Sequence, residues 1–146
     1  MVAIHHNEWV VVCDGAKALV LENTGDPDLP NFRTREVLKH HNLATHELGT
    51  DAPGRAFSSV GAGRSAVGQT DWHTQAETTF LEGLAKELDG LLKAGEVKSL
   101  VIVAPPRALG VLRQAYSPSL RTAVRIEIDK DLVKMPVYEI EKHLSA

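Results

Sequence analysis

The chain opens with two short apolar runs separated by a turn. Glu8–Asp14 (EWVVVCD) and Ala18–Glu22 (ALVLE) flank the dipeptide Asp14-Gly15, and Asp-Gly between two such runs is typical of a β-hairpin. Asn23–Asn31 has the composition of a turn, and Phe32–Leu38 (FRTREVL) alternates weakly, which predicts a third, exposed strand. The pattern therefore predicts an N-terminal antiparallel β-meander.

The longest amphipathic pattern is Trp72–Lys93, where apolar residues recur at helical spacing and Glu and Lys occupy the other face. Either residue of Thr70-Asp71 is a candidate N-cap, and Thr74-x-x-Glu77 is an alternative capping box one turn later. Gly95 is placed to end the helix as its C′ residue. These signals predict a helix over Trp72–Lys93.

A continuous apolar run, Lys98–Ala104 (KSLVIVA), predicts a central strand that is covered on both faces. Pro105-Pro106 ends this strand, and proline in the first turn favours a helix over Arg107–Tyr116. Ser117-Pro118-Ser119 is predicted to end that helix.

Val124–Ile128 (VRIEI) alternates as an edge strand does, and Pro136 begins a terminal helix over Val137–Leu144. Three antiparallel strands followed by a β–α–β unit predict an α/β fold, with helices packed on a mixed sheet. The length of 146 residues predicts one domain, residues 1–146.

Between the meander and the long helix, Gly49–Asp71 contains five glycines, two arginines and no apolar run. It predicts a Gly-rich loop, much longer than the usual ~4–6 residues, and such loops are either functional or disordered. His40–Leu48, just before it, is ambiguous.

Charge and composition limit the function. The net charge of −3 argues against bulk nucleic-acid binding, but residues 97–126 carry five basic side chains and no acidic one. They form either a local basic sector that attracts an anionic partner or a solvated face. The basic residues are Lys98, Arg107, Arg113, Arg121 and Arg125.

No apolar run is long enough for a membrane span, and MVAIHHNEW resembles no signal peptide, so a cytoplasmic protein is expected. The single cysteine, Cys13, is interpreted as a core residue in a reducing compartment. His5-His6, His40-His41 and His46 lack metal-ligand spacing, so no metal is expected. No nucleotide fingerprint or nucleophile elbow is present, so no cofactor is expected.

The junction of loop and helix has features that suit an anionic ligand. A helix N-terminus favours phosphate or carboxylate, Arg55 and Arg64 would add positive charge, and Gly68 permits close approach of a partner. Gln69 presents an uncharged amide beside Thr70. The alternative is a flexible connector with an ordinary cap.

Several segments together resemble the bacterial host attachment protein family. They are WVVVCDGAKALVLEN, DWHTQAETTFLEGLAKELDGLL, LVIVAPPRALGVLRQ and VRIEIDKDLVKMPVYEIEKHL. That family is similar to the central domain of archaeal and eukaryotic class 1 peptide release factors, where a Gly-Gly-Gln loop precedes a long helix. Gly68 and Gln69 match the second glycine and the glutamine. Val67 replaces the first glycine, and a β-branched residue resists φ > 0.

The resemblance implies a fold like that domain and contact with RNA or the ribosome. The leading hypothesis is a non-catalytic binding module that contacts the ribosome or tRNA. Its candidate binding residues are Arg55, Arg64, Gly68, Gln69, Thr70, His73, Arg107 and Arg113. One alternative is residual peptidyl-tRNA ester hydrolysis with Gln69 as the catalytic residue, and another is an attachment-related protein-interaction factor.

Overall fold

The computed structural model describes residues 3–39 and 54–144, with only the backbone described for residues 54–73. The described chain forms one five-stranded mixed sheet in the order β3-β2-β1-β4-β5. The strands are β1 (Trp9–Cys13), β2 (Lys17–Asn23), β3 (Phe32–Lys39), β4 (Leu100–Ala104) and β5 (Val124–Asp129). The helices are α2 (Gly54–Lys93), α3 (Pro106–Ala115), α4 (Pro118–Ala123) and α5 (Val137–Leu144).

The predicted α/β fold is confirmed. β2 pairs antiparallel with both β1 and β3, which is the expected meander, and β4 pairs parallel with β1 and β5. β4 is the predicted central strand, and β5 lies at the edge of the sheet, as its alternating sequence indicates.

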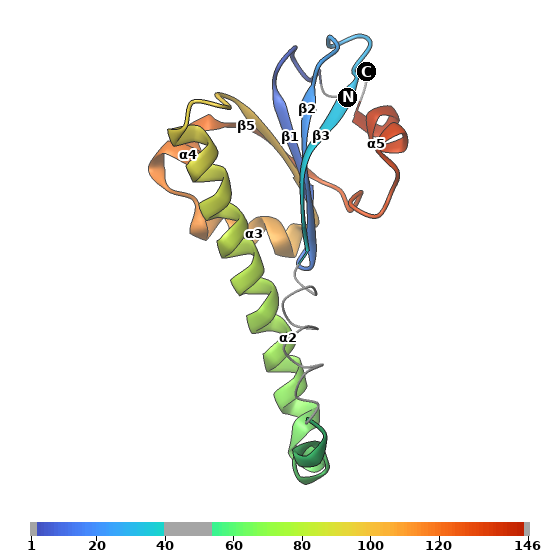
Figure 1. Ribbon diagram of the computed structural model, residues 1–146, viewed down its shortest axis with the longest axis vertical. Coiled ribbons are helices and arrows are strands. Elements are labelled where there is room, and N and C mark those ends of the chain that lie inside the picture. Colours follow the sequence, from blue (N-terminus) through green and yellow to red (C-terminus); the bar gives the residue numbers. More distant parts are fainter. Residues whose placement is uncertain (1–2, 40–53, 145–146) are drawn as a thin grey trace.

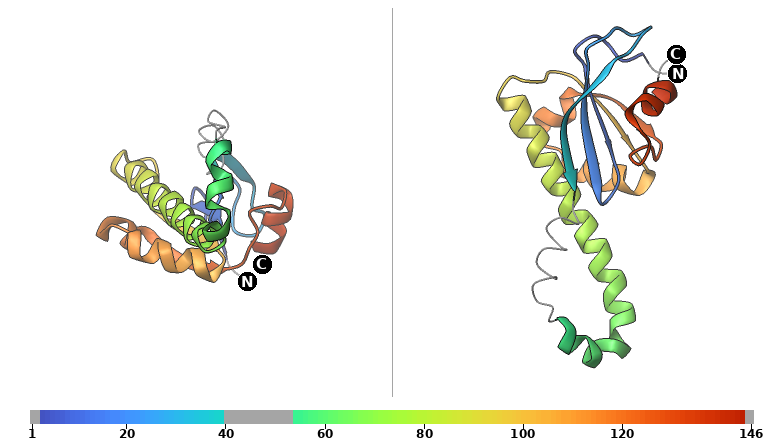
Figure 2. Two further views of the ribbon diagram at one scale, coloured as in Figure 1. Left: turned by 90° about the horizontal axis from the view of Figure 1, so that it is seen from below. Right: turned by 45° about the vertical axis from the view of Figure 1, so that its right-hand side comes forward.

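The sheet separates two apolar cores. Every residue of β1 and β4 is buried, and because successive side chains point to opposite faces, each strand contributes to both cores. On one face the sheet packs against α2, α3 and α4, through residues such as Leu88, Leu112 and Leu120. On the other it packs against α5 through Ile140 and Leu144. Figures 1 and 2 show these three layers.

The largest departure from the sequence prediction lies in α2. Residues 54–71 are helical rather than a loop, so the helix begins eighteen residues before Trp72. Glycine disfavours a helix by about 1 kcal/mol each, which is why the segment resembles a loop. Extension of an existing helix needs no new nucleus, however, and no proline lies between Pro53 and Pro105 to interrupt it. Residues 40–53, including the ambiguous segment, lie outside the described residues.

Two regions of α2 have different surroundings. Its C-terminal half packs on the sheet through Leu81, Leu84 and Leu88. Its N-terminal half, residues 54–73, runs past the end of the sheet and projects from the body (Figure 1). We call residues 54–73 the arm.

The predicted end of α2 is confirmed and its predicted caps are wrong. Gly95 adopts φ +78° just beyond the helix and donates its N–H to the Leu92 carbonyl. Thr70, Asp71 and Thr74 lie inside the helix and therefore cannot be its N-cap.

The short helix α4 was not predicted. Ser117-Pro118 ends α3 as expected, but the Ser117 hydroxyl also accepts a hydrogen bond from the Leu120 N–H at 3.0 Å. Serine as N-cap followed by proline at the first position begins a new helix, so the same residues end one helix and start another.

Replacing Gly83 or Gly90 with alanine is expected to stabilise the protein. Both glycines lie inside α2, and a Cβ at either would meet no atom within 4 Å. Each change should therefore raise the free energy of unfolding by about 0.5–1 kcal/mol, measured by urea denaturation. Gly95→Ala is the matched control and should lower it, because an L-residue resists the positive φ. A decrease for Gly83→Ala would contradict the assignment of a regular helix.

Candidate functional site

Most of the candidate binding residues lie on the arm. The helical backbone of α2 carries six of them. They are Arg55, Arg64, Gly68, Gln69, Thr70 and His73. The other two, Arg107 and Arg113, lie near opposite ends of α3.

The tripeptide Val67-Gly68-Gln69 has a helical backbone, so the expected loop tip is not present there. Gln69 precedes Thr74 by five residues, which places it about 7.5 Å from Thr74 along the axis of a regular helix. The tripeptide therefore lies just beyond the point at which the arm leaves the body. This geometry differs from the loop on which the hydrolase alternative depends.

Three elements meet where the arm leaves the body. Arg107, in the first turn of α3, donates from Nη2 to the Thr74 hydroxyl at 3.1 Å. The same nitrogen lies 3.6 Å from Glu77 Oε1, and Glu77 is one helical turn after Thr74 on α2. A Cβ on Gly15, in the β1–β2 turn, would lie only 2.7 Å from Glu77 Cγ. We call Gly15, Thr74, Glu77 and Arg107 the root cluster.

Gly15 has a specific role in this cluster. The turn itself is held by Asp14, whose Oδ1 accepts hydrogen bonds from the N–H groups of Ala16 and Lys17 at 2.8 and 2.9 Å. The missing side chain at Gly15 leaves the space that Glu77 occupies. The Asp-Gly sequence thus both forms the hairpin and lets α2 approach it closely.

The root cluster borders a crevice of about 270 Å³, with Thr78, Pro105 and Val111 also in its walls. The crevice lies at the carboxyl ends of β1 and β4. The chain leaves β1 toward β2 and leaves β4 toward β5, so the order of the sheet reverses between these two strands. Crevices at such switch points are the usual ligand sites of open α/β sheets.

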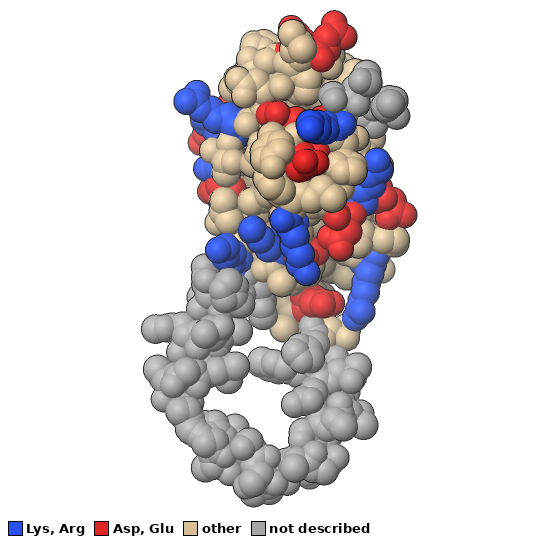
Figure 3. Space-filling view, turned by 90° about the vertical axis from the view of Figure 1, so that its right-hand side faces the viewer, with Lys and Arg blue, Asp and Glu red and all other residues tan. Residues whose placement is uncertain are grey.

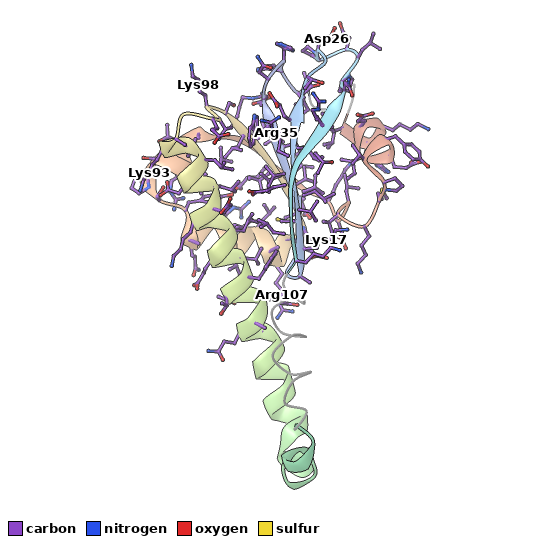
Figure 4. All side chains as sticks on the ribbon, in the orientation of Figure 1. Lys17, Asp26, Arg35, Lys93, Lys98 and Arg107 are labelled. Atoms are coloured by element: carbon purple, nitrogen blue, oxygen red, sulfur yellow. The ribbon has the colours of Figure 1, made fainter. Side chains whose placement is uncertain are left out.

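Other basic residues lie at the same end of the body. Lys17 begins β2 and is paired in register with Lys39, the last residue of β3. Figure 4 shows Lys17 and Arg107 together where α2 leaves the sheet. In the side view of Figure 3, several Lys and Arg side chains gather at the lower end of the described surface, with acidic side chains beside them.

The five basic residues of segment 97–126 do not form one basic sector. Arg113 Nε donates to Glu127 Oε1 at 2.7 Å, and Arg121 donates to the Arg113 carbonyl at 2.9 Å. Arg125 donates to both carboxylate oxygens of buried Glu8 at 2.7 Å. Arg107 in turn contacts Glu77. Three of the four arginines of the segment therefore pair with acidic residues from outside it. The solvated-face alternative describes this segment better.

Arg113 and Arg107 thus belong to different surroundings. Arg113 faces Glu127 of β5, whereas Arg107 faces Thr74 and Glu77 of α2, just after the arm. The structure places Arg107 beside α2 where the arm leaves the body, and it leaves Arg113 apart from that place. Thr74, Glu77, Lys17 and Lys39 join this end of the body but were not predicted as site residues. The pattern Thr74-x-x-Glu77, interpreted in the sequence as a capping box, could have indicated that these two side chains lie together, since residues three apart share a helix face.

Cysteine and histidine are the other residues whose chemistry the sequence raised. Cys13 is fully buried, and burial raises the pKa of its thiol to about 12, so it is a core residue as expected. Within residues 3–39 and 74–144, no group of three or more His, Cys, Asp and Glu side chains could hold a metal ion. His6 Nδ1 instead lies 2.7 Å from the Gly25 carbonyl. His40, His41 and His46 lie outside the described residues.

None of the helices in the described part of the chain is long and apolar enough to cross a membrane.

Comparison with known families gives one clear relationship. A family model described as "Protein required for attachment to host cells" matches residues 9–144, which include every strand and helix that the structure describes. No curated protein matches the chain at a significant level. The chain therefore belongs to the family of proteins required for attachment to host cells.

Proposed function

We propose that this protein is a non-catalytic cytoplasmic binding module that contacts RNA, on the ribosome or as tRNA, through the arm and the root cluster. The observation that carries the proposal is the position of Arg107 at the base of a projecting helix. Arg107 is 68% exposed and so is accessible to a partner.

The charge along the arm supports an anionic partner. The arm contains two arginines, Arg55 and Arg64, and one acidic residue, Asp71. Together with Arg107 and the pair Lys17 and Lys39, the two arginines make five cationic side chains along the arm and at its base. A chain with net charge −3 that gathers cations in one region can bind phosphates locally without binding nucleic acid over its whole surface.

The resemblance of the family to the release-factor central domain also supports RNA as the partner. In that domain the segment before the long helix enters the ribosome, and here the corresponding segment is the projecting arm. An effect on attachment to host cells would then be indirect, through the synthesis of other proteins.

Co-sedimentation with ribosomes tests the proposal. The protein should pellet with ribosomes at roughly 50 mM salt and largely lose that binding at roughly 200 mM, because phosphate contacts are salt-dependent. Arg107→Glu should weaken binding at low salt. Arg33→Glu is the control with the same change in charge, since Arg33 is exposed on β3 and pairs in register with Glu22, at the opposite end of the sheet. Absence of binding at low salt, or equal effects of the two variants, would contradict the proposal.

The hydrolase alternative is tested in the same preparation. Ribosomes carrying peptidyl-tRNA are incubated with the protein or with its Gln69→Ala variant, and released peptide is measured. The proposal predicts no release above background by either protein. Release that depends on Gln69 would favour the enzyme over the binding module.

A further inference from the structure

We propose that the Glu77 carboxylate holds the position at Arg107 that an RNA phosphate takes on binding, so that Glu77 is an internal competitor of the RNA. This inference rests on the proposed function and adds the location of one phosphate and the group it displaces. The two oxygens that Arg107 faces, from Thr74 and Glu77, both belong to α2.

The geometry at Arg107 suits exchange of one anion for another. A guanidinium presents several N–H donors in a plane and binds carboxylate or phosphate with similar geometry. Arg107 Nη2 lies 3.1 Å from the Thr74 hydroxyl and 3.6 Å from Glu77 Oε1, so the contact with the carboxylate is the looser of the two. The Thr74 hydroxyl can also donate to an anion bound at the guanidinium.

The Glu77–Arg107 pair is exposed enough to open. The side chains are 68% exposed for Arg107 and 43% exposed for Glu77. An exposed ion pair of this kind contributes little to stability. An RNA phosphodiester carries the same single negative charge as a carboxylate and suits the guanidinium equally well, so it can replace Glu77 without unfolding the contact between α2 and α3.

The crevice provides the space that the incoming group needs. Its volume of about 270 Å³ lies directly beside Arg107 and Glu77. Asp14 also lines it, but Asp14 Oδ1 is engaged by two backbone N–H groups of the turn. Glu77 is thus the carboxylate that contacts the arginine there, and its side chain packs against Gly15.

The test compares RNA affinity in matched variants by fluorescence anisotropy with a labelled single-stranded RNA. Glu77→Gln should bind the RNA about two- to fivefold more tightly than the wild type. Glu82→Gln is the control, because Glu82 is an exposed residue of α2 and the change in net charge is the same. The gain from Glu77→Gln should disappear when Arg107 is also changed to Gln, because Glu77 and the RNA phosphate then have no shared cation to compete for.

The outcomes separate this inference from the proposed function. If the wild type binds RNA but Glu77→Gln and Glu82→Gln have equal affinity, or if the gain persists with Arg107→Gln, the competitor idea is wrong and RNA binding stands. If no variant binds RNA, the proposed function fails.

A measurement without RNA keeps the competition itself testable. Inorganic phosphate is titrated while the Arg107 Nε–H resonance is followed by NMR. Half-saturation should occur at about two- to fivefold lower phosphate in Glu77→Gln than in the wild type. Equal half-saturation in the two proteins would overturn the inference.

Discussion

Arg125→Met is expected to lower the free energy of unfolding by about 3–5 kcal/mol, which is the largest stability effect that we expect from one substitution. Glu8 is 3% exposed and receives two hydrogen bonds from Arg125 and one from the Ser99 hydroxyl at 2.6 Å. Removing the guanidinium leaves a buried carboxylate without its counter-charge. Urea denaturation at pH 7, followed by tryptophan fluorescence, measures the loss.

The pH dependence of the free energy of unfolding identifies the unpaired Glu8 carboxylate as the cause of the instability of Arg125→Met. Burial alone would raise the pKa of Glu8, but the hydrogen bonds from Arg125 and Ser99 outweigh it and lower the pKa from 4.5 to about 2. The ionised Glu8, with all its partners, therefore contributes on the order of 3 kcal/mol of stability above pH 4.5, and this contribution is lost as the pH falls toward 2. The difference between wild type and Arg125→Met should accordingly shrink over that range.

A control and a second variant make this prediction sharper. Arg113→Met removes a more exposed ion pair, with Arg113 55% exposed, and should cost about 1 kcal/mol or less. Replacing Glu8 and Arg125 together with methionine should cost less than Arg125→Met alone, because no unpaired charge remains. A double variant as unstable as the single one would show that packing, rather than charge, holds these strands together.

The second large effect concerns RNA. Changing Arg55, Arg64 and Arg107 together to glutamine should lower the affinity for single-stranded RNA by roughly a hundredfold at 0.1 M salt. The reason is that each lost phosphate contact removes about 0.7 from the slope of log K against log salt. Anisotropy with labelled RNA measures the change, and circular dichroism should show an unchanged fold.

The control for this triple variant lies at the other end of the body. Arg33 and Lys98 are exposed residues near the amino ends of the parallel strands, and changing both to glutamine should alter the affinity by less than about fivefold. A similar loss in both variants would indicate attraction to overall charge and not to the arm and root cluster.

The strands and packing of this fold were largely predictable from the sequence. β1 and β4 are continuous apolar runs because both of their faces are covered, and the turn Asp14-Gly15 fixes the pairing of β1 with β2. The two helical segments that the sequence analysis missed each depend on an adjoining helix. The Gly-rich segment before Trp72 is helical because it extends α2, and Ser117 begins α4 although it also ends α3.

The candidate site was only partly predictable, because charge along a sequence differs from charge in space. Arg125 and Glu8 are 117 residues apart, and Glu127 lies one residue beyond the acid-free segment 97–126. Both pairs neutralise arginines that the sequence presents as a basic sector. Arg107 alone among the four arginines faces α2, and only the fold shows that it lies at the base of the arm.

The central claim is that phosphates of RNA contact the arm and the root cluster, and the salt dependence of binding tests it most directly. The slope of log K against log salt should be clearly negative for the wild type. It should be smaller in magnitude by about 2 for the variant with Arg55, Arg64 and Arg107 changed to glutamine. Equal slopes for the two proteins, or a wild-type slope near zero, would contradict the claim.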